Sequence, residues 1–130
     1  MKLRSDGIVQ ATPAADYSNN EGYGVTLGVT SSKLTATVSA SATVVIEGII
    51  TEAGTVAQGV AVAIPGSVCG SVHVKLSGTV TAGDKLIQAA DGTFVTDSGS
   101  GARVVVGVAL ESGVSGDLIE MAVQTPQVLS

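Results

Sequence analysis

The sequence predicts an all-β fold: a small β-sandwich or barrel-like domain of short antiparallel strands, with an extended N-terminal arm. Three observations predict this fold. Val and Ala supply most of a 45% hydrophobic fraction, whereas charged residues make up only 13% and aromatic residues 2% of the 130 residues. Val, Ile and Thr are stiff at χ1 and suit a pleated strand better than a helix. The 17 glycines divide the chain into short runs, and one of these runs alternates between apolar and polar residues.

The first 23 residues differ from the rest of the chain. They are polar and rich in turn formers, and they contain Tyr17 and Tyr23, two of the three aromatic residues. Pro13 and the Asn and Gly residues that follow it oppose a long regular element. We expect residues 1–23 to form an extended or flexible arm and residues 24–130 to form the β-domain. Such an arm either stays disordered or becomes ordered on a neighbouring subunit, with the tyrosines as anchors.

The clearest periodicity lies between residues 34 and 50. One parity carries Leu34, Ala36, Val38, Ala40, Ala42, Val44, Ile46 and Ile50, and the other carries mainly Ser and Thr. This alternation predicts strands with one buried face and one exposed face. The run is longer than a typical strand, so we expect a break around residues 39–41. Val45 and Ile49 add apolar side chains to the polar face, which predicts that this end is covered on both sides.

Six further strands are predicted after this run. They cover residues 59–64, 71–76, 85–88, 93–96, 103–110 and 117–124. Pro65-Gly66 ends the first of these strands, because proline cannot donate to a ladder and glycine supports a reversal. Asp91-Gly92 favours a two-residue hairpin turn. Many short strands separated by regular turns are typical of a sandwich or a small barrel.

Few side chains of the sequence could perform catalysis. Alternation places His73, the sole histidine, on the exposed face of its strand together with Lys75. Cys69 is the sole cysteine, so an intrachain disulfide is impossible, and a small turn or buried thiol is expected. Four carboxylates fall in turns, where aspartate satisfies backbone amides: Asp84, Asp91, Asp97 and Asp117. The sequence therefore predicts no enzyme, no catalytic residue, no cofactor and no metal site.

Charge and hydropathy limit the classes of partner. A net charge of −5 with scattered Lys and Arg argues against direct binding of nucleic acid. The longest apolar runs have the length of strands, whereas a transmembrane helix needs about 20 residues, and the first ten residues lack the apolar core of a signal peptide. We therefore expect a protein made in the cytoplasm with no membrane partner. A mean hydropathy of +0.48 then predicts apolar surface that is covered in an oligomer or by a partner.

Two short sequence motifs between residues 72 and 124 are distinctive. The first is VTAGDKL at residues 80–86, followed by ADG at residues 90–92. The second is VGVALES at residues 106–112, followed by SGDLI at residues 115–119. Together they resemble the small head decoration, or cement, proteins of tailed bacteriophages. The resemblance covers residues 44–124 and is densest from residue 72 onward.

The resemblance implies a structural protein of the virion. Such a protein binds the outer surface of the phage head as an oligomer, commonly a homotrimer, and stabilises the shell by bridging capsomers. The implied partners are the major capsid protein and further copies of the chain. The candidate contacts with the shell lie in the arm: Lys2, Arg4, Tyr17 and Tyr23. The alternative is a carbohydrate- or protein-binding β-module of a phage tail fibre or adhesin.

Overall fold

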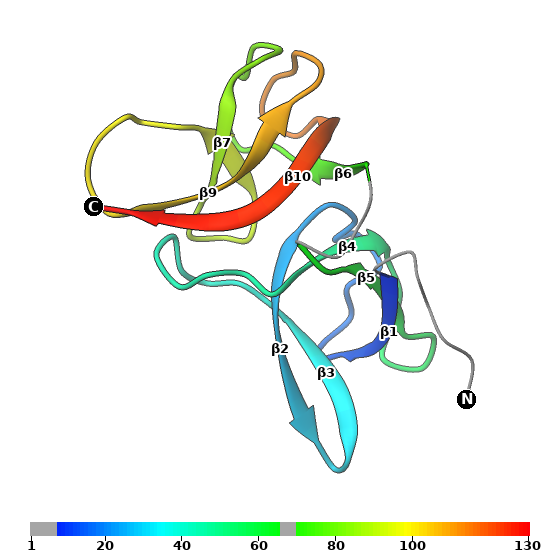
Figure 1. Ribbon diagram of the computed structural model, residues 1–130. Helices are drawn as coiled ribbons and strands as arrows, with labels where there is room; N and C mark the ends of the chain where they lie inside the picture. The colour runs from blue at the N-terminus through cyan, green and yellow to red at the C-terminus, as the bar shows by residue number, and fades with distance from the viewer. Residues whose placement is uncertain (1–7, 66–69) are drawn as a thin grey trace.

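The computed structural model describes residues 8–65 and 70–130, and every regular element in these ranges is a β-strand. A closed barrel has the strand order β1-β3-β2-β4-β5 and contains β1 (Ile8–Pro13), β2 (Gly24–Thr30), β3 (Lys33–Val38), β4 (Gly48–Glu52) and β5 (Val60–Ala63). A five-stranded sheet has the order β6-β10-β9-β7-β8 and contains β6 (Ser71–Lys75), β7 (Lys85–Gln88), β8 (Phe94–Thr96), β9 (Arg103–Ala109) and β10 (Leu118–Leu129). Figure 1 shows the barrel in the lower part of the view and the sheet in the upper part. The prediction of an all-β, barrel-like fold is confirmed.

The β2–β3 hairpin explains the first half of the alternating run. Its register pairs apolar residues with one another: Val25 with Val38, Leu27 with Ala36, and Val29 with Leu34. One face of the hairpin is therefore apolar, and near the base of the hairpin this face lines the core of the barrel. β2 was not among the predicted strands, although its Val-Thr-Leu-Gly-Val sequence alternates in the same way.

The break predicted at residues 39–41 is present and is longer than expected. β3 ends at Val38, and the chain runs without regular structure until β4 begins at Gly48. Ile49 packs in a core shared with the sheet, whereas Ile50 packs inside the barrel. This confirms that the end of the alternating run is covered on both sides.

Residues 8–13 show that the expected N-terminal arm is wrong from Ile8 onward. They form β1, which pairs antiparallel with β5 from Ile8↔Ala63 to Ala11↔Val60. β1 then pairs parallel with β3 and so closes the barrel. The turn-forming residues that suggested an arm begin only at Pro13, the last residue of β1. β1 also covers one edge of β5, which would be unpaired without it. Residues 1–7, which include Lys2 and Arg4, lie outside the described residues.

The strands predicted after residue 58 correspond to β5–β10. β10 continues to Leu129 instead of ending at residue 124, past an irregularity of its ladder between Val123 and Gln127. The predicted two-residue turn at Asp91-Gly92 is wider than expected, because Gln88 pairs with Phe94 and Ala89 N–H donates to Thr93 O. Gly66 and Cys69 lie outside the described residues.

One apolar core joins the barrel to the sheet. It contains Ile46, Ile49, Ala63, Val72, Val74, Leu76, Val80, Leu86, Phe94, Val104, Val106, Ala109, Ile119 and Met121. Three of these residues, Ile46, Ile49 and Ala63, belong to the barrel half of the chain, so the two sheets share buried surface. β1 therefore belongs with the β-domain and not with an arm, and this domain consists of a barrel and a sheet packed on a common core.

Candidate interaction surfaces

The turn aspartates bind backbone amides, as the sequence predicted. Asp84 Oδ2 accepts from Thr81 N–H at 3.0 Å, and Asp117 Oδ2 accepts from Val114 N–H at 2.9 Å. Asp97 Oδ1 accepts from Gly99 N–H and lies 2.5 Å from Arg103 Nε. The Gly99 amide, with a further contribution from Arg103, holds the pKa of Asp97 below its ordinary value. These carboxylates fix turns of the sheet.

The stability of the β7–β8 turn is expected to depend on pH through Asp91. The hydroxyl and amide of Thr93 donate to Asp91 and lower its pKa from the ordinary value of 3.8, although partial burial opposes this shift. Because the pKa of Asp91 is lower in the folded state than in the unfolded state, the ionised carboxylate stabilises the fold above about pH 4. This contribution is lost as the pH falls from about 4 through the pKa of the folded state. Urea unfolding at a series of pH values should show the loss.

Two variants isolate this contribution from other acid effects. Asp91→Asn has no carboxylate to protonate, so the difference in unfolding free energy between wild type and Asp91→Asn should shrink as the pH falls below about 4. Thr93→Val removes the hydroxyl donor and should weaken the same pH dependence. If the difference between wild type and Asp91→Asn stayed constant down to about pH 2, the assignment to Asp91 would be wrong.

His73 lies on the exposed face of β6, as predicted, between the buried residues Val72 and Val74. It is paired in register with Glu120 of β10. Lys75 Nζ donates to Gly116 O at 3.1 Å, so this cation helps to hold the loop before β10. Within residues 8–65 and 70–130, no group of three or more His, Cys, Asp or Glu side chains is arranged to hold a metal ion.

The two candidate tyrosines belong to the barrel. Tyr17 packs against the barrel core, and its hydroxyl accepts a hydrogen bond from Val38 N–H at 3.1 Å. Tyr23 is half-buried, and it lies so close to Gly92 that a Cβ atom on this glycine would approach the tyrosine ring to 3.1 Å. The structure therefore gives Tyr17 a role within the fold, and contact of either tyrosine with a shell stays a prediction.

Tyr17→Phe is expected to lower the free energy of unfolding by about 1–3 kcal/mol, because the partly buried Val38 N–H loses its acceptor. Tyr23→Phe is the matched control, since no hydrogen bond joins the Tyr23 hydroxyl to the described residues, and it should change stability by less than about 0.5 kcal/mol. Chemical denaturation measures both variants. Equal effects of the two substitutions would contradict a structural role for the Tyr17 hydroxyl.

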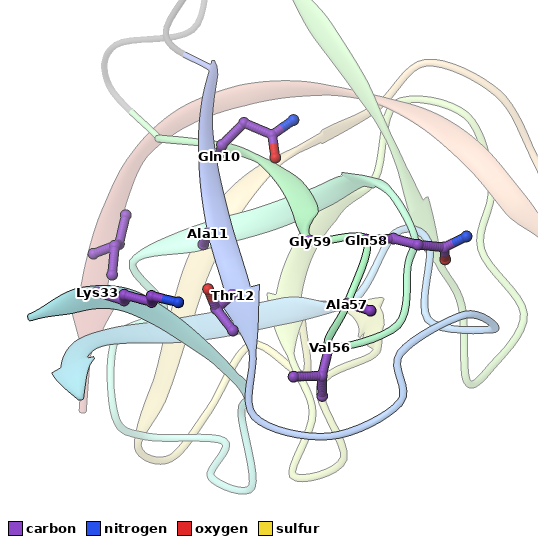
Figure 2. A pocket seen from close by; sticks show the side chains of 9 residues that line it. Gln10, Ala11, Thr12, Lys33, Val56, Ala57, Gln58 and Gly59 are labelled. Carbon is purple, nitrogen blue, oxygen red and sulfur yellow. The ribbon is translucent and has the colours of Figure 1, made fainter. Parts of the chain in front are cut away.

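A groove lies where β1 and β3 part. The parallel ladder joins Thr12 to Thr35 and Pro13 to Ala36, and the strands diverge before these pairs. The groove has a volume of about 420 Å³ and is lined by Gln10, Ala11, Thr12, Lys33, Leu34, Val56, Ala57, Gln58 and Gly59. Figure 2 shows Lys33 extending toward Thr12, while Val56 and Gln58 lie on the loop beyond β1. The sequence did not predict the groove, because β1, one of its walls, was expected to be an arm.

Exposed apolar side chains lie near two places, the groove end of the barrel and the β9–β10 connection, and Val44 and Val128 are exposed elsewhere. Val29, at the tip of the β2–β3 hairpin, is 74% exposed, and Val56, in the groove, is 54% exposed. The second place is the connection between β9 and β10, where Leu110, Val114 and Leu118 are exposed. In Figure 1 the hairpin tip and the β9–β10 connection lie at opposite ends of the molecule. The described residues include no helix long and apolar enough to cross a membrane.

Comparison with known proteins finds similarity in structure. No family model matches the chain, and no curated protein matches its sequence. Among solved structures, the chain is similar to the head fiber gp8.5 N base in bacteriophage phi29, with a TM-score of 0.65 and 16% sequence identity. The match covers 95% of this chain and 98% of the other. The expected resemblance to phage head proteins is therefore confirmed at the level of fold: the chain shares the fold of a bacteriophage head fiber base.

Proposed function

We propose that this chain is a structural protein of a bacteriophage head. It binds the outer surface of the shell as an oligomer, contacts the major capsid protein and stabilises the shell by bridging neighbouring capsomers. The observation that carries the proposal is the similarity in fold to a phage head fiber base over nearly the full length of both chains. The protein acts as a component of the virion and performs no catalysis.

The chemistry of the described surface supports an adhesive role. The turn aspartates are engaged with backbone amides, and His73 stands on an exposed strand face. The exposed face of the β2–β3 hairpin consists largely of Thr and Gly, which pack against a partner without the cost of desolvating charges. On a regular shell, many weak contacts of this kind add up through multivalency.

Co-sedimentation with purified phage heads that lack the protein tests the proposal. The full chain is expected to sediment with the heads and to saturate at a fixed number of copies per head. Heads carrying the chain should also resist heating better than bare heads, because bridging contacts must be broken before capsomers separate. A chain that stays in the supernatant at every concentration would rule the proposal out.

The shell contact is proposed to include the N-terminal residues Lys2 and Arg4. The double variant Lys2→Ala/Arg4→Ala tests this contact, and so does deletion of residues 1–7, which leaves β1 in place. Deletion of residues 1–23 is unsuitable, because it removes β1 and opens the barrel. Both changes should weaken sedimentation with heads while circular dichroism and the unfolding transition stay unchanged. Undiminished binding would remove these residues from the contact.

The alternative, a carbohydrate- or protein-binding module of a tail fibre or adhesin, makes a different prediction. A glycan array probed with the purified chain would then show reproducible binding to particular sugars. Such binding, combined with no sedimentation on heads, would favour the alternative.

A further inference from the structure

We propose that copies of this chain bind one another by seating the exposed loop between β9 and β10 of one copy in the groove between β1 and β3 of the next. This inference deepens the proposed function, on which it rests for its biological meaning. The loop lies at the far end of the sheet, and the strands β1 and β3 that flank the groove lie in the barrel, so the loop of one copy does not reach its own groove (Figure 1). The partner is therefore a second copy of the same chain.

The loop presents a rigid apolar side chain to solvent. Val114 is 56% exposed at a turn in which its N–H donates to Asp117 Oδ2 and its carbonyl accepts from Asp117 N–H at 3.0 Å. Gly113 exchanges two hydrogen bonds with Val80, and Gly116 N–H donates to Leu76 O. A loop held by so many bonds has little conformational entropy left to lose on binding. An apolar side chain fixed in water in this way is well suited to an interface.

Two large apolar side chains of the groove, Leu34 and Val56, can receive such a side chain, beside polar residues that also line the groove. The apolar face of the β2–β3 hairpin extends beyond the barrel as far as the pair Val29 and Leu34. Leu34 also lines the groove. Val56 faces the same groove from the loop between β4 and β5 and is more than half exposed. Burial of Val114 against Leu34 and Val56 would remove apolar surface of both copies from water.

The charges of the two surfaces are complementary. Of the described residues that line the groove, Lys33 alone is charged. Three carboxylates, Glu111, Asp117 and Glu120, are exposed around the loop and outnumber the neighbouring cation Lys75, which donates to Gly116 O. A cationic groove and an acidic, apolar loop attract each other, whereas two grooves or two loops repel. This charge pattern favours contact between unlike surfaces, which builds a ring or a filament.

Sedimentation equilibrium of the full chain over a wide range of concentration tests the contact. The wild type should self-associate, and Val114→Asp and Val56→Asp should each raise the dissociation constant at least about tenfold. Lys33→Glu should weaken association as well, because the groove then repels the acidic loop. Val44→Asp is the matched control: Val44 is 57% exposed outside both surfaces, and its substitution should change nothing. Val114→Ser and Val56→Ser add no charge, and each should also raise the dissociation constant.

Mixing the two aspartate variants gives the sharpest result. A Val114→Asp chain keeps an intact groove and a Val56→Asp chain keeps an intact loop, so an equimolar mixture should form a 1:1 pair that neither variant forms alone. A wild type that is monomeric at every concentration would overturn the inference, as would association of either aspartate variant as strong as that of Val44→Asp. Self-association without binding to phage heads would instead leave the inference intact and refute the proposed function.

Discussion

Phe94→Ala is expected to lower the free energy of unfolding by about 3–5 kcal/mol, the cost of removing a buried aromatic ring. Phe94 is fully buried on the three-residue strand β8, in the core that joins the sheet to the barrel. Its ring reaches the barrel backbone, since a Cβ atom on Gly24 would lie 3.2 Å from Phe94 Cζ. Alanine would leave a cavity at the junction of the two sheets. Thermal or urea unfolding of the full chain measures the loss.

Two further variants keep this prediction testable if Phe94→Ala does not fold. Phe94→Leu fills most of the site and should cost less than the alanine variant. Val128→Ala is the exposed control, because Val128 is 63% exposed on β10, and it should stay within about 0.5 kcal/mol of the wild type. A cost for Phe94→Ala no larger than that for Val128→Ala would show that the ring does not join the two sheets.

The fold class and most strands could be predicted because each depends on local pattern. The alternation from Leu34 onward and the aspartates in turns are patterns within a few consecutive residues, so they can be read without knowing which other segments pack nearby. β1 was missed because its residues gain their structure from β5 and β3, which are far away in the sequence. A six-residue strand beside a turn-rich segment has no local feature that separates it from an extended arm.

The candidate surfaces were less predictable than the fold for the same reason. Tyr17 was singled out as an aromatic residue in a polar segment, but only the folded chain places its hydroxyl at Val38 N–H. The groove is formed by residues from β1, β3 and the loop between β4 and β5, which come together only when the barrel closes. Val114 lies between the two parts of the second motif that suggested the phage resemblance, yet the conformation of its loop depends on the bonds to Val80 and Leu76.

Gln88→Met is expected to lower the free energy of unfolding by about 2–4 kcal/mol, because the buried Ile46 N–H loses its acceptor and the partly buried Val44 carbonyl loses its donor. Gln88 lies on β7 and is only 1% exposed. Its Oε1 accepts from Ile46 N–H at 3.1 Å, and its Nε2 donates to Ser41 O and Val44 O at 3.1 and 2.5 Å. One side chain of the sheet therefore holds the irregular segment between β3 and β4. Gln127→Met, at an exposed position of β10, is the control and should be nearly neutral.

Gln88→Glu separates loss of donors from loss of volume, because glutamate has nearly the same shape as glutamine. An ionised carboxylate keeps an acceptor for Ile46 N–H, but it turns an oxygen toward the carbonyl oxygens of Ser41 and Val44, which in the wild type accept hydrogen bonds from Gln88 Nε2. Burial and these carbonyls would raise the pKa of the new carboxyl in the folded state, so its destabilising effect is full at neutral pH and declines on acidification. The gap in unfolding free energy between wild type and Gln88→Glu should therefore narrow toward about pH 4, while the gap for Gln88→Met stays nearly constant. Parallel gaps for the two variants would show that Gln88 contributes by packing and not through its donors to Ser41 and Val44.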